Sequence, residues 1–400
     1  MAVSPQRKKK TSRKPRARKQ EKSSSRPVIP DCKRFTGYKP CIPGMVCTEE
    51  CADYDPIGTR ILIVNLDAMG NVLVTTTILP ALKRRYPKST ILWITLPNAY
   101  RLLENNPFID RVFLWEPESW LILQQMQFDL VLNADKAQRS CAFLNGLTAK
   151  VKRGFGLDGN GKIVPVNKEA YYNYQLGLDD HLKFHVNTKT VTELLAGQFA
   201  LPYRRDEYTL ILSNEEEEFC GQYRVRAGLP SGPEGGLVVG FNTGCSELYP
   251  NKKMTIEQHL TLIDRLSGMP GVRLVLVGGP EDTERNAEIV RRAGGKVLST
   301  PTTEGVRRGL CYINLCDVVI SGDSFGMHAA IGLKKHVIVW FGVSCPQEIE
   351  LYGRGIKLIP EGLACSPCWK RQCPYNLECI GMIDLDAIVA EVDRVRQLRA

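Results

Sequence analysis

Residues 60–87 read RILIVNLDAMGNVLVTTTILPALKRRYP. The run Ile61–Leu66 is almost entirely aliphatic, which is typical of a strand buried on both faces in a parallel sheet. The run ends in a turn at Gly70, and apolar residues then recur at helical spacing as far as the basic residues 83–85, which suit a helix C-terminus. Pro80 removes an amide donor, so the helix either kinks there or begins later. The stretch predicts a strand, a tight turn and a helix.

The turn at residues 67–71 is a candidate binding element. In open α/β sheets, ligands bind beyond the carboxyl ends of the strands, where helix N-termini present free amides to anionic groups. The same pattern also occurs in β–α units that bind nothing. The turn therefore indicates function only together with a second site elsewhere in the chain.

The composition is that of a globular chain. Its 400 residues are 43% hydrophobic and 24% charged, which is enough for two or three domains. No apolar run reaches the ~18 residues that span a bilayer, and the N-terminus lacks the apolar segment of a signal peptide. We expect a cytoplasmic protein, with peripheral contact to the inner face of the membrane as a further option.

The net charge of +10 resides in residues 1–30, which hold eleven Lys and Arg against one acidic residue, Glu21. A segment so basic and so poor in apolar residues is predicted to be disordered. Its charge suits a polyanion, either an anionic membrane surface or, with less support, nucleic acid. A solvated tail without any partner is an equal alternative.

Eight of the fourteen cysteines form two quartets near the ends of the chain. The first lies in a loop-rich segment with wide gaps, and the second begins with Cys-x-x-Cys, a spacing typical of metal ligands. Because stable disulfides are rare in a reducing cytosol, the quartets predict structural Zn or a [4Fe–4S] cluster, and the spacing does not decide between them. The predicted ligands are Cys32, Cys41, Cys47 and Cys51, and then Cys365, Cys368, Cys373 and Cys379. The remaining cysteines are interpreted as small buried hydrophobic residues.

Strands and helices alternate through the rest of the chain, which predicts doubly wound parallel sheets. Residues 153–180, rich in glycine and tyrosine, predict a long irregular excursion that serves the acceptor side of a site. The composition of residues 230–236 is that of a linker. The predicted organisation is a tail at 1–30, a Cys-rich segment at 31–58, a first Rossmann-like domain at 59–229, a second Rossmann-like domain at 236–345, and a Cys-rich segment with a C-terminal helix at 346–400.

Four motifs together resemble glycosyltransferase family 9, the heptosyltransferase-like family of bacterial cell-envelope synthesis. They are the opening stretch, LLENNPFIDRVFLW, VLVGGPEDTE and SGDSFGMHAAIG, and the similarity runs from about residue 60 to 345. The resemblance implies an α/β GT-B fold, with two Rossmann-like halves facing across a cleft. It makes 59–229 the acceptor domain and 236–345 the nucleotide-sugar domain. It also implies inverting transfer of a sugar from a nucleotide-sugar donor to a cell-envelope saccharide or lipid-linked acceptor, as in lipopolysaccharide biosynthesis, with no cofactor required for the transfer.

The family's pattern also implies donor-binding residues in the second half of the chain. A lysine would neutralise the leaving phosphate, an acidic residue would lie near the nucleoside, and a turn before a helix would hold the diphosphate. The corresponding candidates here are Lys252 or Lys253, then Glu281, then Asp323, Ser324, Gly326 and His328.

The catalytic base is the main departure from the family. Where the family usually has an aspartate after the glycine of the first turn, this chain has Asn71, whose amide cannot accept a proton at neutral pH. Asp67 and Asp135 each follow a predicted strand, and we favour Asp67 as the base, although it could merely cap its turn. The alternatives are a catalytically inactive GT-B protein that binds nucleotide or glycan, and a metal-containing or iron–sulfur redox or sensor protein.

Overall fold

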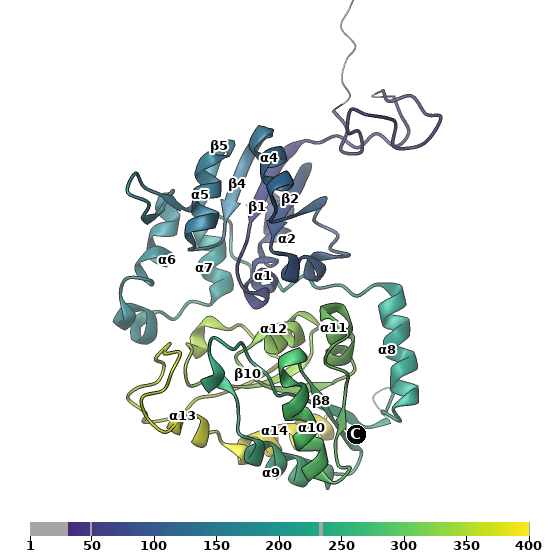
Figure 1. Cartoon of the computed structure of the whole chain (residues 1–400), viewed down its shortest axis with the longest axis vertical. Helices are drawn as coiled ribbons and strands as arrows, with labels where there is room; N and C mark the ends of the chain where they lie inside the picture. Colours follow the sequence, from purple (N-terminus) through teal and green to yellow (C-terminus); the bar gives the residue numbers. More distant parts are fainter. Residues whose placement is uncertain (1–30, 49, 232–234, 400) are drawn as a thin grey trace, which may run out of the picture. The chain divides into compact units, whose positions relative to one another are not determined.

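Figure 1 shows a computed structural model of the chain. Residues 31–48, 50–231 and 235–399 are described. The chain divides into two compact units, Met1–Pro56 and Ile57–Ala400, and each is described by itself. The disordered tail expected at residues 1–30 lies outside the described residues, as does the centre of the linker expected at 230–236.

The first unit is held together by turns. Its described part contains one isolated antiparallel bridge, between Cys32 and Pro56, next to a main-chain hydrogen bond of 2.8 Å from Lys33 N to Asp55 O. No helix or strand occurs in its described residues. This agrees with the loop-rich segment that the sequence predicts.

The second unit contains two sheets, and the first has the order β3-β2-β1-β4-β5-β6. All neighbours are parallel except β5 and β6, and β2 is buried along its whole length. The strands are β1 (Thr59–Val64), β2 (Ser89–Thr95), β3 (Arg111–Leu114), β4 (Gln127–Asn133), β5 (Thr148–Leu157) and β6 (Ile163–Pro165). The sheet and the helices around it are called the first half.

The helices of the first half follow its strands in the expected alternation. The helix predicted after the first turn is divided in two, and Pro80 lies in the first turn of the second piece, where its missing amide breaks no helical hydrogen bond. The helices are α1 (Met69–Thr75), α2 (Ile78–Arg85), α3 (Pro97–Tyr100), η1 (Arg101–Leu103), α4 (Pro117–Gln125), α5 (Gln138–Gly146), η2 (Lys168–Ala170), α6 (Tyr171–Gln175), the π-helix η3 (Leu182–Val186) and α7 (Val191–Gln198).

The irregular excursion predicted over residues 153–180 is wrong in part. Residues 148–165 form the β5–β6 hairpin, and α6 follows it. The glycines that suggested an irregular path instead permit close pairing. A Cβ at Gly154 would lie 2.0 Å from the Asn133 carbonyl oxygen of β4, so only glycine fits this position of the sheet.

The second sheet is entirely parallel, with the order β12-β11-β10-β7-β8-β9. Its strands are β7 (Leu237–Asn242), β8 (Val272–Val277), β9 (Leu298–Ser299), β10 (Val318–Gly322), β11 (His336–Trp340) and β12 (Gly355–Leu358). Counted from its first strand, each sheet has the order 3-2-1-4-5-6, which is the Rossmann order. This sheet and its helices are called the second half.

The helices of the second half include one that precedes its first strand. α8 packs against α11, where the Tyr223 and Tyr312 rings lie 5.1 Å apart. None of the helices in the described part of the chain is long and apolar enough to cross a membrane. The helices are α8 (Asn214–Arg226), η5 (Pro250–Lys252), α9 (Ile256–Ser267), η6 (Pro280–Asp282), α10 (Thr283–Ala293), α11 (Val306–Asn314), α12 (Phe325–Gly332), η7 (Pro346–Glu348), α13 (Glu378–Gly381) and α14 (Leu385–Gln397).

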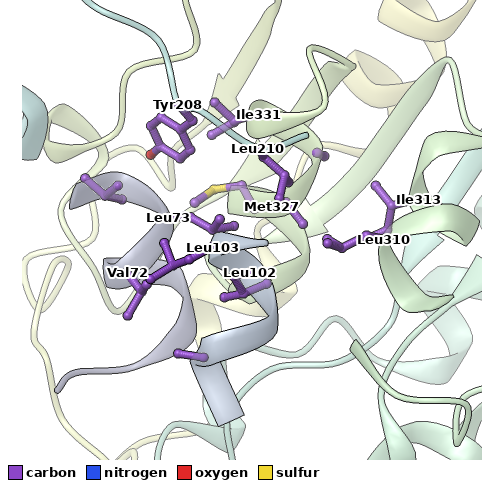
Figure 2. Close-up of a cluster of buried hydrophobic side chains, with 14 of the residues drawn as sticks. Val72, Leu73, Leu102, Leu103, Tyr208, Leu210, Leu310, Ile313, Met327 and Ile331 are labelled. Carbon is purple, nitrogen blue, oxygen red and sulfur yellow. The ribbon is translucent and has the colours of Figure 1, made fainter. Parts of the chain in front are cut away.

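One hydrophobic cluster joins the two halves. Figure 2 shows its side chains from α1 and η1 of the first half meeting those of α11 and α12 of the second half. Tyr208 and Leu210 reach the cluster from the extended segment that connects the halves. The labelled members from the helices are Val72, Leu73, Leu102, Leu103, Leu310, Ile313, Met327 and Ile331. The apolar contact fixes which turns of the two sheets face each other.

Leu102→Ala is expected to destabilise the protein by about 2–5 kcal/mol, because it removes buried methyl groups and leaves a cavity in this cluster. Leu102 is 1% exposed, whereas Leu121 on α4 is 66% exposed, so Leu121→Ala is the matched control and should change stability by less than about 0.5 kcal/mol. Urea unfolding of both variants provides the test. Equal stability of the two variants would show that the cluster contributes little.

Candidate active site

Asp67 lies in the turn between β1 and α1, at the carboxyl edge of the first sheet. Its side chain is exposed, and both carboxylate oxygens accept hydrogen bonds. The Ala68 backbone N–H donates to Oδ1 at 2.7 Å, and the Asn71 amide donates to Oδ2 at 2.8 Å. These bonds orient the carboxylate while leaving it open to solvent. Asn71, also exposed, therefore holds the candidate base in place and offers no proton acceptor of comparable strength.

Asp135 follows β4, the strand next to β1, and lies behind the same turn. It is 3% exposed and accepts a hydrogen bond of 2.5 Å from Asn65 Nδ2 and another from the Leu66 backbone N–H. Burial, together with the nearby charge of Asp67, raises the pKa of Asp135 to about 7. The Asp135 side chain supports the β1 turn from below, whereas the Asp67 carboxylate is exposed to solvent.

Gly70 brings the first turn into contact with the second half. A Cβ at this position would lie 2.6 Å from His328 Cδ2 on α12, so a larger residue would push the two helices apart. His328 is 8% exposed, and its Nδ1 lies 3.1 Å from the Tyr208 hydroxyl. Burial lowers the pKa of His328 to about 4, so its ring is neutral at pH 7. The contact places the start of α1 directly against α12.

The turn after β10 lies at the carboxyl edge of the second sheet, just before α12. Asn242, at the end of β7, donates through Nδ2 to Ser324 Oγ at 2.9 Å and to Ser321 Oγ at 3.0 Å. Gly326 lies directly against the Asn242 side chain, which lets α12 begin close to the strand ends. No side-chain hydrogen bond caps the N-terminus of α12, so its first amides can bind an anionic group. Asn242 was not predicted from the sequence, because no motif connects it with a turn eighty residues away.

Lys252 is the basic residue that the structure places at this turn. Its Nζ forms an ion pair of 2.7 Å with Asp323 Oδ2, and both side chains are 12% exposed. Burial opposes ionisation of Asp323, but the charge of Lys252 and the hydrogen bond that its ammonium group donates outweigh burial and lower the pKa of Asp323. Lys253 points to the buried Asp282 instead, at 3.4 Å. Of the two candidate lysines, Lys252 is the one beside the start of α12.

Glu281 is exposed in η6, just beyond β8. It lies at the carboxyl edge of the same sheet as the Asp323 turn, because β8 and β10 both flank β7. The position is open enough for a bound ligand to reach.

The second cysteine quartet lines one pocket between α13 and the end of β11. Val343, Pro374 and Leu377 are among the apolar residues around it. Burial and the proximity of the other three thiols raise the pKa of Cys379. The four side chains that share this pocket are Cys365, Cys368, Cys373 and Cys379.

The thiols of both quartets are free, and in the residues that the structure describes no three His, Cys, Asp or Glu side chains converge closely enough to hold a metal ion. The structure therefore brings the second quartet into one pocket without forming a complete ligand set. In the first quartet, Cys41 is exposed and the other three are partly buried. The cysteines outside the quartets are buried, as predicted, at positions 141, 220, 245, 311, 316 and 345.

Two facing Rossmann-like halves define the GT-B class of glycosyltransferases. Within this class, the model of glycosyltransferase family 9 (heptosyltransferase) matches residues 120–378, and the chain belongs to that family. The protein is therefore a glycosyltransferase. The match begins after the first turn and includes most of the second cysteine quartet. It does not cover Asp67 and Asn71, so any role for these two residues has to be argued from their positions in the structure.

Relatives and solved structures agree with this assignment. The chain is 24% identical over 305 residues to the lipopolysaccharide core heptosyltransferase OpsX of Haemophilus influenzae, covering 72% of this chain and 81% of the relative. The E. coli ADP-heptose lps heptosyltransferase II has a TM-score of 0.64 at 17% identity, over 86% of this chain and 100% of that one. The iron-containing glycosyltransferase TibC of enterotoxigenic E. coli has a TM-score of 0.50 at 12% identity, over 85% of this chain and 77% of that one. At these identities, the structural likeness shows the fold.

Proposed function

We propose that the protein transfers a heptose or a related sugar from a nucleoside-diphosphate donor to a saccharide acceptor of the lipopolysaccharide type. The observation that carries the proposal is the close approach of Gly70 to His328. Gly70 follows the exposed Asp67 in the first turn, and His328 lies on the helix that follows the Lys252–Asp323 pair, which supports a shared site at this contact. A base on one wall and a cationic anion site on the other are the two parts that glycosyl transfer requires. The names of the heptosyltransferase relatives support the choice of sugar and acceptor.

The reaction follows from these positions. The acceptor hydroxyl attacks the anomeric carbon while the Asp67 carboxylate takes its proton, and the bond from that carbon to the diphosphate breaks. Lys252 and the first amides of α12 stabilise the negative charge that develops on the departing diphosphate. Attack from the face opposite the leaving group inverts the anomeric configuration, and Glu281 lies where it can contact the nucleoside.

His328 and Lys253 take supporting positions in this proposal. The neutral His328 ring contributes no positive charge to the diphosphate, and it maintains the packing of α12 against α1 and Tyr208. Lys253 neutralises Asp282, whose Oδ2 accepts from the Gly279 backbone N–H at 3.0 Å and so shapes the turn that carries Glu281.

The experiment that tests the function is a thermal-shift screen of nucleotide sugars, followed by a transfer assay with any donor that stabilises the protein. ADP-heptose is expected to raise the melting temperature and to be consumed faster when a truncated lipopolysaccharide core is present. A nucleotide sugar that stabilises the protein but is not consumed with any acceptor would instead support an inactive binding protein. Asn71 in the place of the family's aspartate is the observation that favours that second candidate.

We also propose that the second cysteine quartet binds a structural metal ion or iron–sulfur cluster. Four thiols around one apolar pocket fit Zn or iron, which prefer thiolate ligands and would lower the thiol pKa values on binding. TibC is an iron-containing glycosyltransferase, which supports iron as one of the two candidate metals. Metal bound here would stiffen the loop between β12 and α13 and would not take part in the transfer step.

Cys368→Ser is expected to lower both the metal content and the melting temperature, because a structural metal contributes directly to folding free energy. Cys316 is a buried cysteine outside the pocket, so Cys316→Ala should keep the metal even if it loses some stability. Elemental analysis of anaerobically purified protein gives the measurement. Wild-type protein without Zn or iron would contradict the proposal.

The basic segment 1–30 is proposed to bind anionic membrane surfaces, since it carries the whole net charge of the chain. Deleting it should weaken binding to anionic vesicles in a salt-dependent way and leave donor binding unchanged. Vesicle sedimentation with and without the segment measures this. Equal vesicle binding by both forms would exclude the role, and loss of nucleic-acid binding alone would assign the segment to nucleic acid.

A further inference from the structure

Trp369 lies within the second cysteine quartet and near ammonium groups from both halves of the protein. Its ring centroid is 4.4 Å from Lys183 Nζ and 5.0 Å from Lys252 Nζ. Lys183 belongs to η3 in the first half, and Lys252 ends η5 in the second half. Cations at these distances from an indole are attracted by its π electrons. One side chain on the cysteine loop thus contacts both halves.

The backbone around Trp369 is held firmly in place. The N–H groups of Cys368 and Trp369 both donate to the Val343 carbonyl, at 3.1 and 2.9 Å. Trp369 has a φ of +49°, in the left-handed region that bulky residues rarely adopt. A strained residue persists only where its surroundings require it, and such positions concentrate at functional sites. The loop is built to present this ring.

The same loop also contacts the segment that carries Lys252. Asn251 Nδ2 donates to the Lys370 carbonyl at 2.9 Å, and the Tyr249 ring meets Trp369 edge to face, with centroids 5.6 Å apart. The Tyr249 ring is the second aromatic ring beside Lys252, and its centroid lies 5.1 Å from Lys252 Nζ. The ammonium group of Lys252 is thereby held between two aromatic rings and the Asp323 carboxylate.

Lys183 is anchored independently on the second half. Its Nζ lies 3.9 Å from Glu348, and its carbonyl accepts a hydrogen bond of 3.1 Å from Gln347 Nε2. Gln347 and Glu348 belong to η7, which follows β11 closely. The contacts of Trp369 and η7 with Lys183 form a second connection between the halves, separate from the hydrophobic cluster of Figure 2.

We propose that Trp369 is a positioning residue for sugar transfer: it orients Lys252 toward the donor diphosphate and, through Lys183, holds the first half against the second. The inference rests on the proposed function, because it assigns Lys252 to the donor. It adds a role for the cysteine loop, which shapes the donor side of the crevice through this ring. Trp369 itself does not touch the reacting atoms.

The test compares donor binding by calorimetry and steady-state transfer in the full chain. Trp369→Leu should weaken donor binding about tenfold and lower kcat, since both cation–π contacts disappear. Trp369→Phe keeps an aromatic face and should recover donor affinity to within about threefold. Tyr375 is an exposed aromatic residue of the same loop, so Tyr375→Leu is the matched control and should bind donor like the wild type.

A mutant cycle gives the sharpest result. If Trp369 acts through its two lysines, Trp369→Leu should have little further effect on donor affinity in a Lys183→Ala/Lys252→Ala background. Additive effects, or a Trp369→Leu protein with normal donor affinity and only a lower melting temperature, would overturn the positioning role. If Lys252→Ala alone leaves donor affinity unchanged, the failure lies in the donor site of the proposed function.

Discussion

Asp67→Asn is expected to reduce the rate of sugar transfer by about 10²–10⁴-fold, because the acceptor hydroxyl loses its proton acceptor. Donor affinity should stay within about twofold of the wild type, since Asp67 belongs to the first half and the Lys252–Asp323 pair to the second. Single-turnover transfer with preloaded donor measures the step directly. Asp264→Asn is the control, because Asp264 is an exposed residue of α9 that pairs only with Lys296 among its described partners.

Asn71→Asp tests the role of Asp67 by placing a second carboxylate beside it in the same turn. The substitution puts two carboxylates at the distance of the present hydrogen bond, 2.8 Å, where they cannot both ionise readily. Like charges raise the pKa of the pair, so the base stays protonated to higher pH and the acid limb of the pH–rate profile should move upward. If the Asp67→Asn protein transfers sugar at the wild-type rate, Asp67 is not the catalytic base. Activity that appears only in Asn71→Asp would mean that the natural chain is an inactive binding protein.

Lys252→Ala is the second substitution with a large expected effect. Removing a charge that stabilises the leaving diphosphate should lower kcat by about 10²–10³-fold and weaken donor binding as well. Transfer kinetics and calorimetric donor titration measure the two effects. Since the change also leaves Asp323 buried without its partner, the Lys252→Ala/Asp323→Asn double variant separates lost catalysis from lost stability.

Lys253→Ala tests whether Lys252 or its neighbour Lys253 stabilises the leaving diphosphate. Lys253 pairs with Asp282 and lies away from the start of α12, so its loss should affect transfer far less than the loss of Lys252. Lys296→Ala, on the surface beside Asp264, is the neutral control. A larger loss of activity in Lys253→Ala than in Lys252→Ala would reverse the assignment.

Local sequence patterns were sufficient for the parts of the fold that depend on local physics. Buried parallel strands are continuous apolar runs, so β1 and β7 and the turns after them could be located from residues alone. The Asp323 turn and the Lys252–Lys253 pair became candidates through the resemblance to the family, and only the structure shows that Lys252 pairs with Asp323 while Lys253 pairs with Asp282. The parts that depend on distant contacts could not be found, and the β5–β6 hairpin is the main example, because its glycines serve pairing with a neighbouring strand.

The candidate site shows the same division. Asp67 and Asp135 each follow a strand in the sequence, which favours Asp67 only because it shares the turn of Asn71. The structure shows that Asp67 is exposed, whereas Asp135 is buried and supports the turn. Trp369 was overlooked for a similar reason. A tryptophan next to a cysteine suggests packing around a metal site, and its contacts with Lys183 and Lys252 arise from segments more than 100 residues away.

The most direct test of sugar transfer at this crevice is the anomeric configuration of the product that the wild-type protein forms from ADP-heptose and a truncated lipopolysaccharide core. We expect one new glycosidic bond with a configuration opposite to that of the donor, as required for a single displacement assisted by Asp67. Retention of configuration would contradict that mechanism. The absence of any transfer by protein that binds the donor would contradict the enzymatic function itself.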